Sequence, residues 1–281
     1  MTASRIKHLT KPILFFLVAA SALLCGCGGS GGGMVNVGNG NGTLVLHMAD
    51  APTQATVSAV YVTIPKVDAM VGNQWVTVAS PNKTYNLLDL ALTETTLGQA
   101  ELPPGSYSQL RLFVSGASVV DGRGTHTVAV PDAVKSGMAI NVNFTIQSGA
   151  PTTLLLDFNV HQSLNNDGNG NYSLAPSVPA IEERLAGTLS GYSTDGVKGL
   201  PFTEVIASYW AGNSYPIGTN VDVTFSTSDG HFRLWELLPG TYHIELIYFD
   251  PVTLVYKDET FVGIVVSASH DTNVGVCKLP S

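Results

Sequence analysis

Residues 102–107 read Leu-Pro-Pro-Gly-Ser-Tyr and residues 237–242 read Leu-Leu-Pro-Gly-Thr-Tyr, so one short motif occurs twice in the chain. Each copy leads into a strand-like segment, at 110–114 and at 244–248. Pro presets a turn, Gly permits a backbone angle closed to other residues, and the Tyr two positions later can cover a core edge while its hydroxyl reaches a backbone group. The repeat predicts two sandwich corners; the alternative is that these tyrosines contact a ligand.

The rest of the chain is typical of short strands joined by tight turns. Hydrophobic residues make up 44% of the sequence and charged residues 12%, with 29 Gly and 15 Pro. We predict strands over 43–48, 57–67, 75–78, 85–88, 109–115, 125–130, 140–146 and 153–160, and again over 187–192, 204–209, 221–226, 231–234, 242–249, 257–262 and 272–278. A short helix is expected near 89–97. The predicted fold class is all-β, with two antiparallel β-sandwich domains in tandem.

The N-terminus has the layout of a secretory signal. Basic residues at 5, 7 and 11 precede an apolar run from Ile13 to Leu24 that is broken only by Ser21. This run is shorter than the roughly 20 residues that a membrane-spanning helix needs. We therefore expect residues 1–26 to be a cleaved signal peptide.

The end of this segment resembles the lipobox of bacterial lipoproteins, which Leu24, Gly26 and Cys27 match, while Cys25 stands where Ala or Ser is more common. The resemblance implies that Cys27 becomes an acylated N-terminus, and two or more acyl chains hold a protein stably on a bilayer. Gly28 in place of an Asp favours the outer membrane, at its periplasmic or cell-surface face. The alternative is an ordinary signal peptide cut nearby.

The composition of the chain after the predicted signal indicates a tether and two domains. Residues 27–42 are rich in Gly and Asn and predict a flexible tether, followed by domains at 43–180 and 185–281. Loss of the three basic residues of the signal leaves 10 basic and 21 acidic residues, a net charge of −11, so no nucleic-acid partner is expected. Cys277 would be the one remaining thiol, which excludes an intrachain disulfide and favours a small core residue.

Residues 185–280 resemble the carboxypeptidase regulatory-like domain. The likeness is carried by 187–190, 199–205, 227–234 and 238–242, and it departs at 210–220, which is longer than usual. The resemblance implies a transthyretin-like, seven-stranded sandwich of the carbohydrate-binding-like group without catalytic residues.

Residues 42–180 resemble a domain of unknown function common in bacterial lipoproteins. This likeness is carried by 42–44, 47–52, 60–64, 87–88, 102–107, 111–112 and 153–158. It implies an extracytoplasmic β-sandwich with no established chemistry.

The sequence contains no recognisable catalytic motif, and we expect neither an enzyme nor a cofactor. The seven His are scattered; the loose trio His47, Asp50 and Asp68 is better explained by Asp50 capping its own turn than by a metal site. The polar run 165–171 partly matches a calcium loop. The first position of such a loop, however, is Asn165 and not an acidic residue, and its closing position is Pro176 and not Glu, which favours a hairpin loop.

Aromatic residues near 210 give the best candidate for ligand binding. Tyr209, Trp210 and Tyr215 lie in or beside the insertion, where a flat ring could stack on a sugar or cap an apolar ligand. The alternative is that these rings close the end of the sandwich, as Trp75 and Trp235 are expected to do. The predicted function is a non-catalytic, membrane-anchored binding module with carbohydrate as its candidate ligand. The alternative is a structural or adhesive surface protein that binds a protein partner.

Overall fold

The computed structural model describes residues 40–50, 57–212 and 215–280, and the chain from Gly38 onward forms one compact unit. The predicted signal peptide, most of the predicted tether and the predicted acylation at Cys27 lie outside the described residues. Within them the fold is all-β, as predicted, and its helices are limited to the single turns η1 (Leu87–Leu90), α1 (Asp132–Lys135), α2 (Val160–Ser163) and η2 (Glu183–Leu185). No helix of this described part is long and apolar enough to cross a bilayer.

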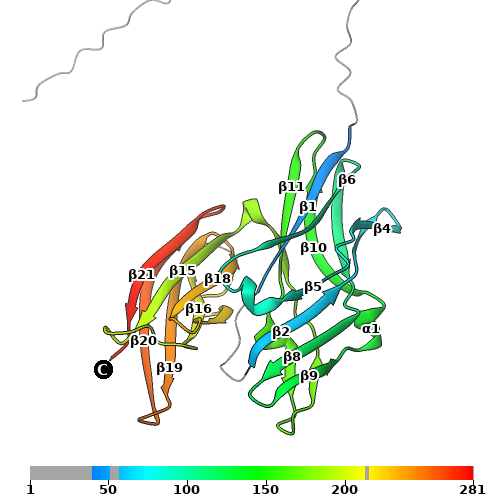
Figure 1. The fold of residues 1–281 in the computed structure, drawn as a ribbon. Coiled ribbons are helices and arrows are strands. Elements are labelled where there is room, and N and C mark those ends of the chain that lie inside the picture. The colour runs from blue at the N-terminus through cyan, green and yellow to red at the C-terminus, as the bar shows by residue number, and fades with distance from the viewer. Residues whose placement is uncertain (1–39, 51–56, 213–214, 281) are drawn as a thin grey trace, which may run out of the picture. The chain divides into compact units, whose positions relative to one another are not determined.

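The first half of the unit contains three sheets (Figure 1). Their strand orders are β14-β11-β1-β6, β10-β7-β3-β4 and β12-β13-β9-β8-β2-β5. The strands are β1 (Gly42–Ala49), β2 (Val57–Ile64), β3 (Val67–Val71), β4 (Gln74–Ala79), β5 (Lys83–Asn86), β6 (Thr95–Leu102), β7 (Gly105–Leu112), β8 (Gly116–Asp121), β9 (Gly124–Ala129), β10 (Met138–Ile146), β11 (Pro151–Asp157), β12 (Leu164–Asn166), β13 (Tyr172–Leu174) and β14 (Ala180–Glu182).

Alternation along β1 builds the core of this half. Leu44, Leu46 and Met48 are fully buried and pack in one large cluster with apolar residues of the other sheets. Burial of such side chains stabilises each by about 1.5–3 kcal/mol. The same alternation turns His47 to the opposite face of the sheet, beside Leu155 of β11, its parallel partner.

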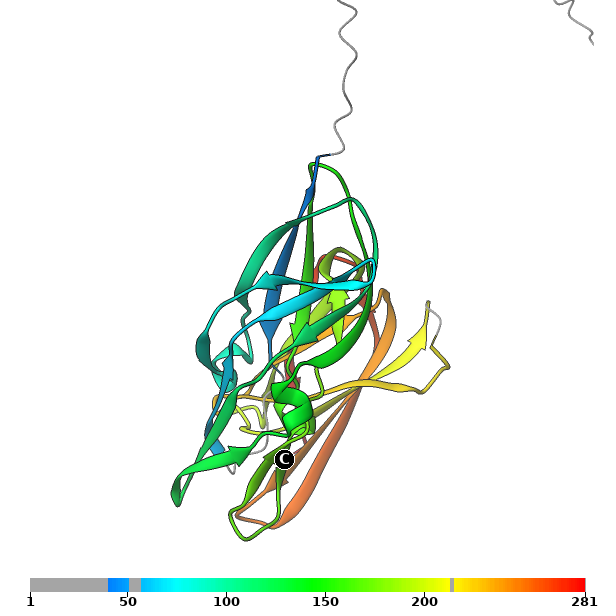
Figure 2. The same cartoon turned by 90° about the vertical axis from the view of Figure 1, so that its right-hand side faces the viewer.

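The second half contains two sheets, which are coloured from yellow-green to red in Figure 2. It has a separate hydrophobic core. The strand orders of the two sheets are β18-β15-β21 and β17-β16-β19-β20. The strands are β15 (Gly187–Thr194), β16 (Glu204–Ala211), β17 (Asn220–Phe225), β18 (His231–Leu237), β19 (Gly240–Asp250), β20 (Val255–Val266) and β21 (Asp271–Lys278). Each of the seven strands predicted after residue 186 is present.

Most strand pairs are antiparallel, but three parallel pairs occur among the described strands. They are β1 with β11, β15 with β21, and β9 with β13. Two of these pairs join the first strand of a half to a strand near the end of that half. The sequence pattern indicated strands but did not reveal this pairing.

Both tyrosine corners form as predicted. The Tyr107 hydroxyl donates to the Pro103 carbonyl at 2.7 Å, and the Tyr242 hydroxyl donates to the Leu238 carbonyl at 2.5 Å. Both rings are buried. The glycines differ, because Gly105 has a φ of 152° whereas Gly240 has no positive φ.

The prediction of a helix at 89–97 is wrong. The chain forms the turn η1 at 87–90 and then enters β6 at Thr95, where Leu97 points into the core. Thr95 and Thr96 are β-branched, and pairing with β1 satisfies their backbone groups, so sheet formation outweighs the heptad spacing. The strand expected at 57–67 is instead divided at Pro65, which cannot donate a ladder hydrogen bond.

Candidate functional site

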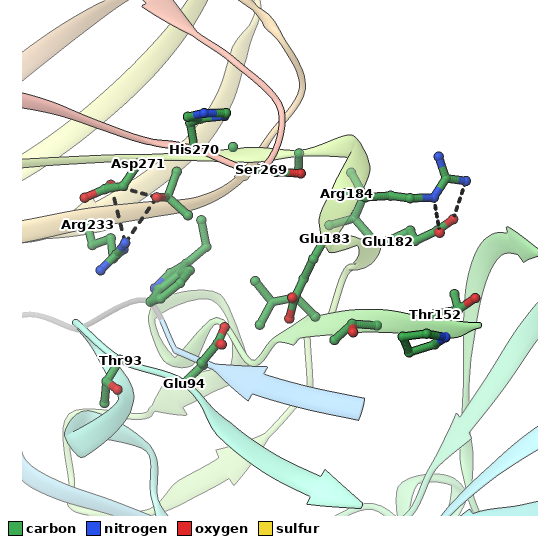
Figure 3. Close-up of a pocket in the computed structure, with 18 of the residues that line it drawn as sticks. Thr93, Glu94, Thr152, Glu182, Glu183, Arg184, Arg233, Ser269, His270 and Asp271 are labelled. Atoms are coloured by element: carbon green, nitrogen blue, oxygen red, sulfur yellow. Dashed lines mark hydrogen bonds and ion pairs between the residues drawn. The ribbon is translucent and has the colours of Figure 1, made fainter. Parts of the chain in front are cut away.

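A cleft of about 580 Å³ opens on the described surface. Its lining comes from the segment before β6, from β11, from β14 and η2, and from β15, β18 and the turn before β21. Figure 3 shows that charged side chains reach into it from several of these segments. Carboxylates and a guanidinium therefore share one partly enclosed space.

Arg233 organises one wall of the cleft. Its guanidinium lies 4.5 Å from the ring centroid of Trp235 and donates to the Leu92 carbonyl at 3.3 Å. It also donates to Thr188 Oγ1 at 3.2 Å and pairs with Asp271 at 3.4 Å (Figure 3). Four partners fix the guanidinium plane, which an Arg fork allows and a Lys would not.

Trp235 is buried rather than presented to a ligand. Its ring packs with Ala49 and Leu155 in a small apolar cluster. The pairing of β15 with β18 is irregular at Thr188 of β15. In β18, Glu236, the residue after Trp235, has a φ of 58°. This bulge turns Trp235 toward β11 and confirms the expectation of a core-edge position.

His47 lies between two carboxylates. His47 Nδ1 is 2.7 Å from Glu183 Oε1 and 3.3 Å from Glu94 Oε1. Glu94 directly precedes β6, Glu183 begins η2 just after β14, and both line the cleft. Burial, and secondarily the negative charge of Glu94, raises the pKa of Glu183, while the hydrogen bond from His47 opposes this rise.

A second acidic group lies where β11, β17 and β18 meet. Burial, and then repulsion from neighbouring carboxyls, raises the pKa values of Asp157 and Glu236 well above their usual range, and burial raises that of Asp222 to about 7. Among the described residues, Asp157 Oδ1 and Glu236 Oε1 have no hydrogen-bond partner. Burial and mutual repulsion therefore favour the protonated forms of these carboxyls.

The three aromatic residues predicted to bind ligand occupy different environments. Tyr209 is 3% exposed and packs edge-on against Tyr242 at 5.9 Å. Trp210 is 48% exposed and stacks on His243, with ring centroids 4.4 Å apart and planes 19° apart. Tyr215 is 39% exposed and meets the ring of Tyr209 edge-on at 6.0 Å. Trp210 and Tyr215 are thus accessible, whereas Tyr209 belongs to the core.

The trio His47, Asp50 and Asp68 is not brought together. Asp50 Oδ1 accepts from the Val160 backbone N–H at 3.1 Å, while the turn that it is expected to cap, at residues 51 and 52, lies outside the described residues. Asp68 contacts Lys66 and Thr77, each at 2.7 Å. The acidic partners of His47 are instead Glu94 and Glu183, which no local spacing in the sequence indicates.

Two further expectations are met by the geometry. The run 165–171 forms a hairpin loop between β12 and β13, in which Asp167 accepts from the backbone N–H groups of Asn169 and Asn171. Cys277 is a buried free thiol, and burial raises its pKa to about 11.

Fold and site together define a protein of two β-sandwich halves with a charged cleft and a separate exposed aromatic surface. Residues 41–176 match the family described as Domain of unknown function (DUF4382), in agreement with the expectation of a domain of unknown function in this segment. The likeness of residues 185–281 to the carboxypeptidase regulatory-like domain stays a prediction. No curated protein sequence matches the chain.

Several solved structures show a distant similarity. The Bacillus anthracis TIE protein is 14% identical with a TM-score of 0.27, over 86% of this chain and 34% of its own. The Lactobacillus rhamnosus GG shaft pilin SpaA is 11% identical with a TM-score of 0.22, over 86% and 98%. BcpA, the major pilin subunit of Bacillus cereus, is 9% identical with a TM-score of 0.24, over 85% and 69%. At these scores the function has to be argued from the chain itself.

Proposed function

We propose that the protein is a non-catalytic binding module, anchored outside the cytoplasm by acylated Cys27, and that it binds carbohydrate on Trp210. The observation that carries the proposal is the indole fixed flat on His243 with nearly half of the side chain exposed. A ring already ordered by the protein loses little conformational freedom on binding. Ring faces of this kind stack on the apolar faces of sugars.

The local backbone supports this role. The register of β16 against β19 shifts between Tyr209 and Ala211, so Trp210 occupies a bulge. A bulge re-aims a side chain relative to its neighbours. Ser208, two positions before Trp210 on β16, donates to Asn220 of the adjoining strand β17 at 2.7 Å, so polar side chains are available on these strands.

A glycan array with the full-length chain in detergent tests the proposal. Binding of a glycan by the wild type should be lost in Trp210→Ala and retained in Tyr256→Ala, which removes another exposed aromatic from the same sheet. No binding to any glycan, or equal binding by both variants, would refute carbohydrate recognition at Trp210.

The second candidate is an adhesive or structural role through a protein partner. β20 is an edge strand of 12 residues, and its side chains Val255, Val262 and Val265 are more than half exposed. An exposed apolar edge presents unpaired backbone groups that another strand can pair with. This role is favoured if the glycan array is negative and if a Lys at position 262 or 265 abolishes capture of the partner.

A further inference from the structure

The cluster of His47, Glu94 and Glu183 has the composition of a metal site. One ligand atom from each residue lies within 4.8 Å of the other two. Atoms bound to a common ion at about 2.0–2.2 Å are about 3 Å apart, which is close to the two measured contacts of His47. The three residues come from different segments, so the fold and not a local turn gathers them.

Positive charge is scarce at this cluster. In the part of the chain that the structure describes, neither Glu94 nor Glu183 forms an ion pair with a Lys or an Arg, and the imidazole of His47 is the contact that both share. The neighbouring Arg184 is paired with Glu182 instead. One half-buried and one exposed carboxylate on a single imidazole leave a negative charge that a bound cation would balance.

We propose that His47 Nδ1, Glu94 and Glu183 bind a divalent transition-metal ion of the Zn²⁺ type. An imidazole nitrogen with two carboxylates suits Zn²⁺ and similar ions, whereas Ca²⁺ and Mg²⁺ prefer oxygen ligands alone. Three protein ligands leave a coordination position for water or for an oxygen of another molecule. Since both glutamates line the cleft, that position faces it. Figure 3 shows the two carboxylates reaching into the same part of the cleft.

This site is independent of carbohydrate binding on Trp210, and its test uses the metal alone. The full-length chain is stripped with a chelator, exchanged into buffer above the usual pKa of His, and titrated with ZnCl₂ in a calorimeter. Glu94→Gln, Glu183→Gln and His47→Gln should each weaken Zn²⁺ binding at least tenfold. Zn²⁺ should also raise the melting temperature of the wild type but not of these variants.

His126→Gln is the matched control. His126 contacts one carboxylate, that of Asp121, which Arg123 already neutralises. This variant should bind Zn²⁺ as the wild type does. Equal affinity of wild type and the three cluster variants, or an equal loss in His126→Gln, would overturn the proposal. Should His47→Gln fail to fold, Glu94→Gln decides the matter, because the Glu94 side chain is exposed.

Discussion

The tyrosine corner allows a quantitative prediction for Tyr242→Phe. The substitution keeps the ring, which is 0% exposed, and removes only the hydroxyl that donates to the Leu238 carbonyl at 2.5 Å. A hydrogen bond contributes about 0.5–1.5 kcal/mol net, and leaving a buried acceptor unsatisfied costs about 1–3 kcal/mol. We therefore expect the free energy of unfolding to fall by about 1–3 kcal/mol. Each kcal/mol lowers the melting temperature of a unit of this size by about 2–4 °C.

Urea denaturation followed by tryptophan fluorescence measures this change. Tyr107→Phe, which removes the equivalent 2.7 Å bond in the first half, should lower stability by a similar amount. Tyr256→Phe is the control, because this side chain is 69% exposed and should leave stability within about 0.5 kcal/mol. If Tyr242→Phe is as stable as the wild type, or if the control loses as much, the corner does not stabilise the fold as argued.

Three further predictions concern buried groups. Because burial raises the pKa of Asp222 to about 7 from a usual 3.8, the folded state keeps a proton that the unfolded state loses, so stability should fall as pH rises from about 4 to 7. Denaturation at a series of pH values should show a shallower fall in Asp222→Asn, and an unchanged slope would contradict this assignment. Cys277 should resist thiol reagents at pH near 8 until the protein unfolds, as peptide mapping can show; rapid labelling of the folded chain would be inconsistent with its burial. Gly199→Ala should destabilise by more than about 1 kcal/mol, because its Cβ would lie 1.9 Å from the Asp229 carbonyl oxygen, whereas Gly122→Ala meets no atom and should have little effect; equal melting temperatures would refute the steric argument.

Much of the fold was predictable because side-chain alternation is a local property. Leu44, Leu46 and Met48 indicate one buried face of β1, and the strands after residue 186 show similar patterns. The segment at 89–97 was not predictable in this way, because Leu90 and Leu97 are both buried but belong to different elements. Pairing with β1, a tertiary interaction, decides the conformation there.

The candidate site depends even more on long-range register. His47 and Glu183 are 136 positions apart, and Glu183 reaches the imidazole because β14 pairs with β11 and β11 with β1. No pattern within a window of the sequence contains that information. Trp210 could be identified as a candidate because Gly212 and Asn213, which follow it closely in the sequence, indicate a loop, but its stacking on His243 follows from the β16–β19 register.

The parallel pairing of β1 with β11 and of β15 with β21 imposes an order on folding. During synthesis β1 emerges long before its parallel partner, and closing so long a loop is slow. Each half can complete its first sheet only when its late strand has arrived. The chain should therefore stay incompletely folded until almost all of a half is available, which is the state that the export proposed for this protein would require.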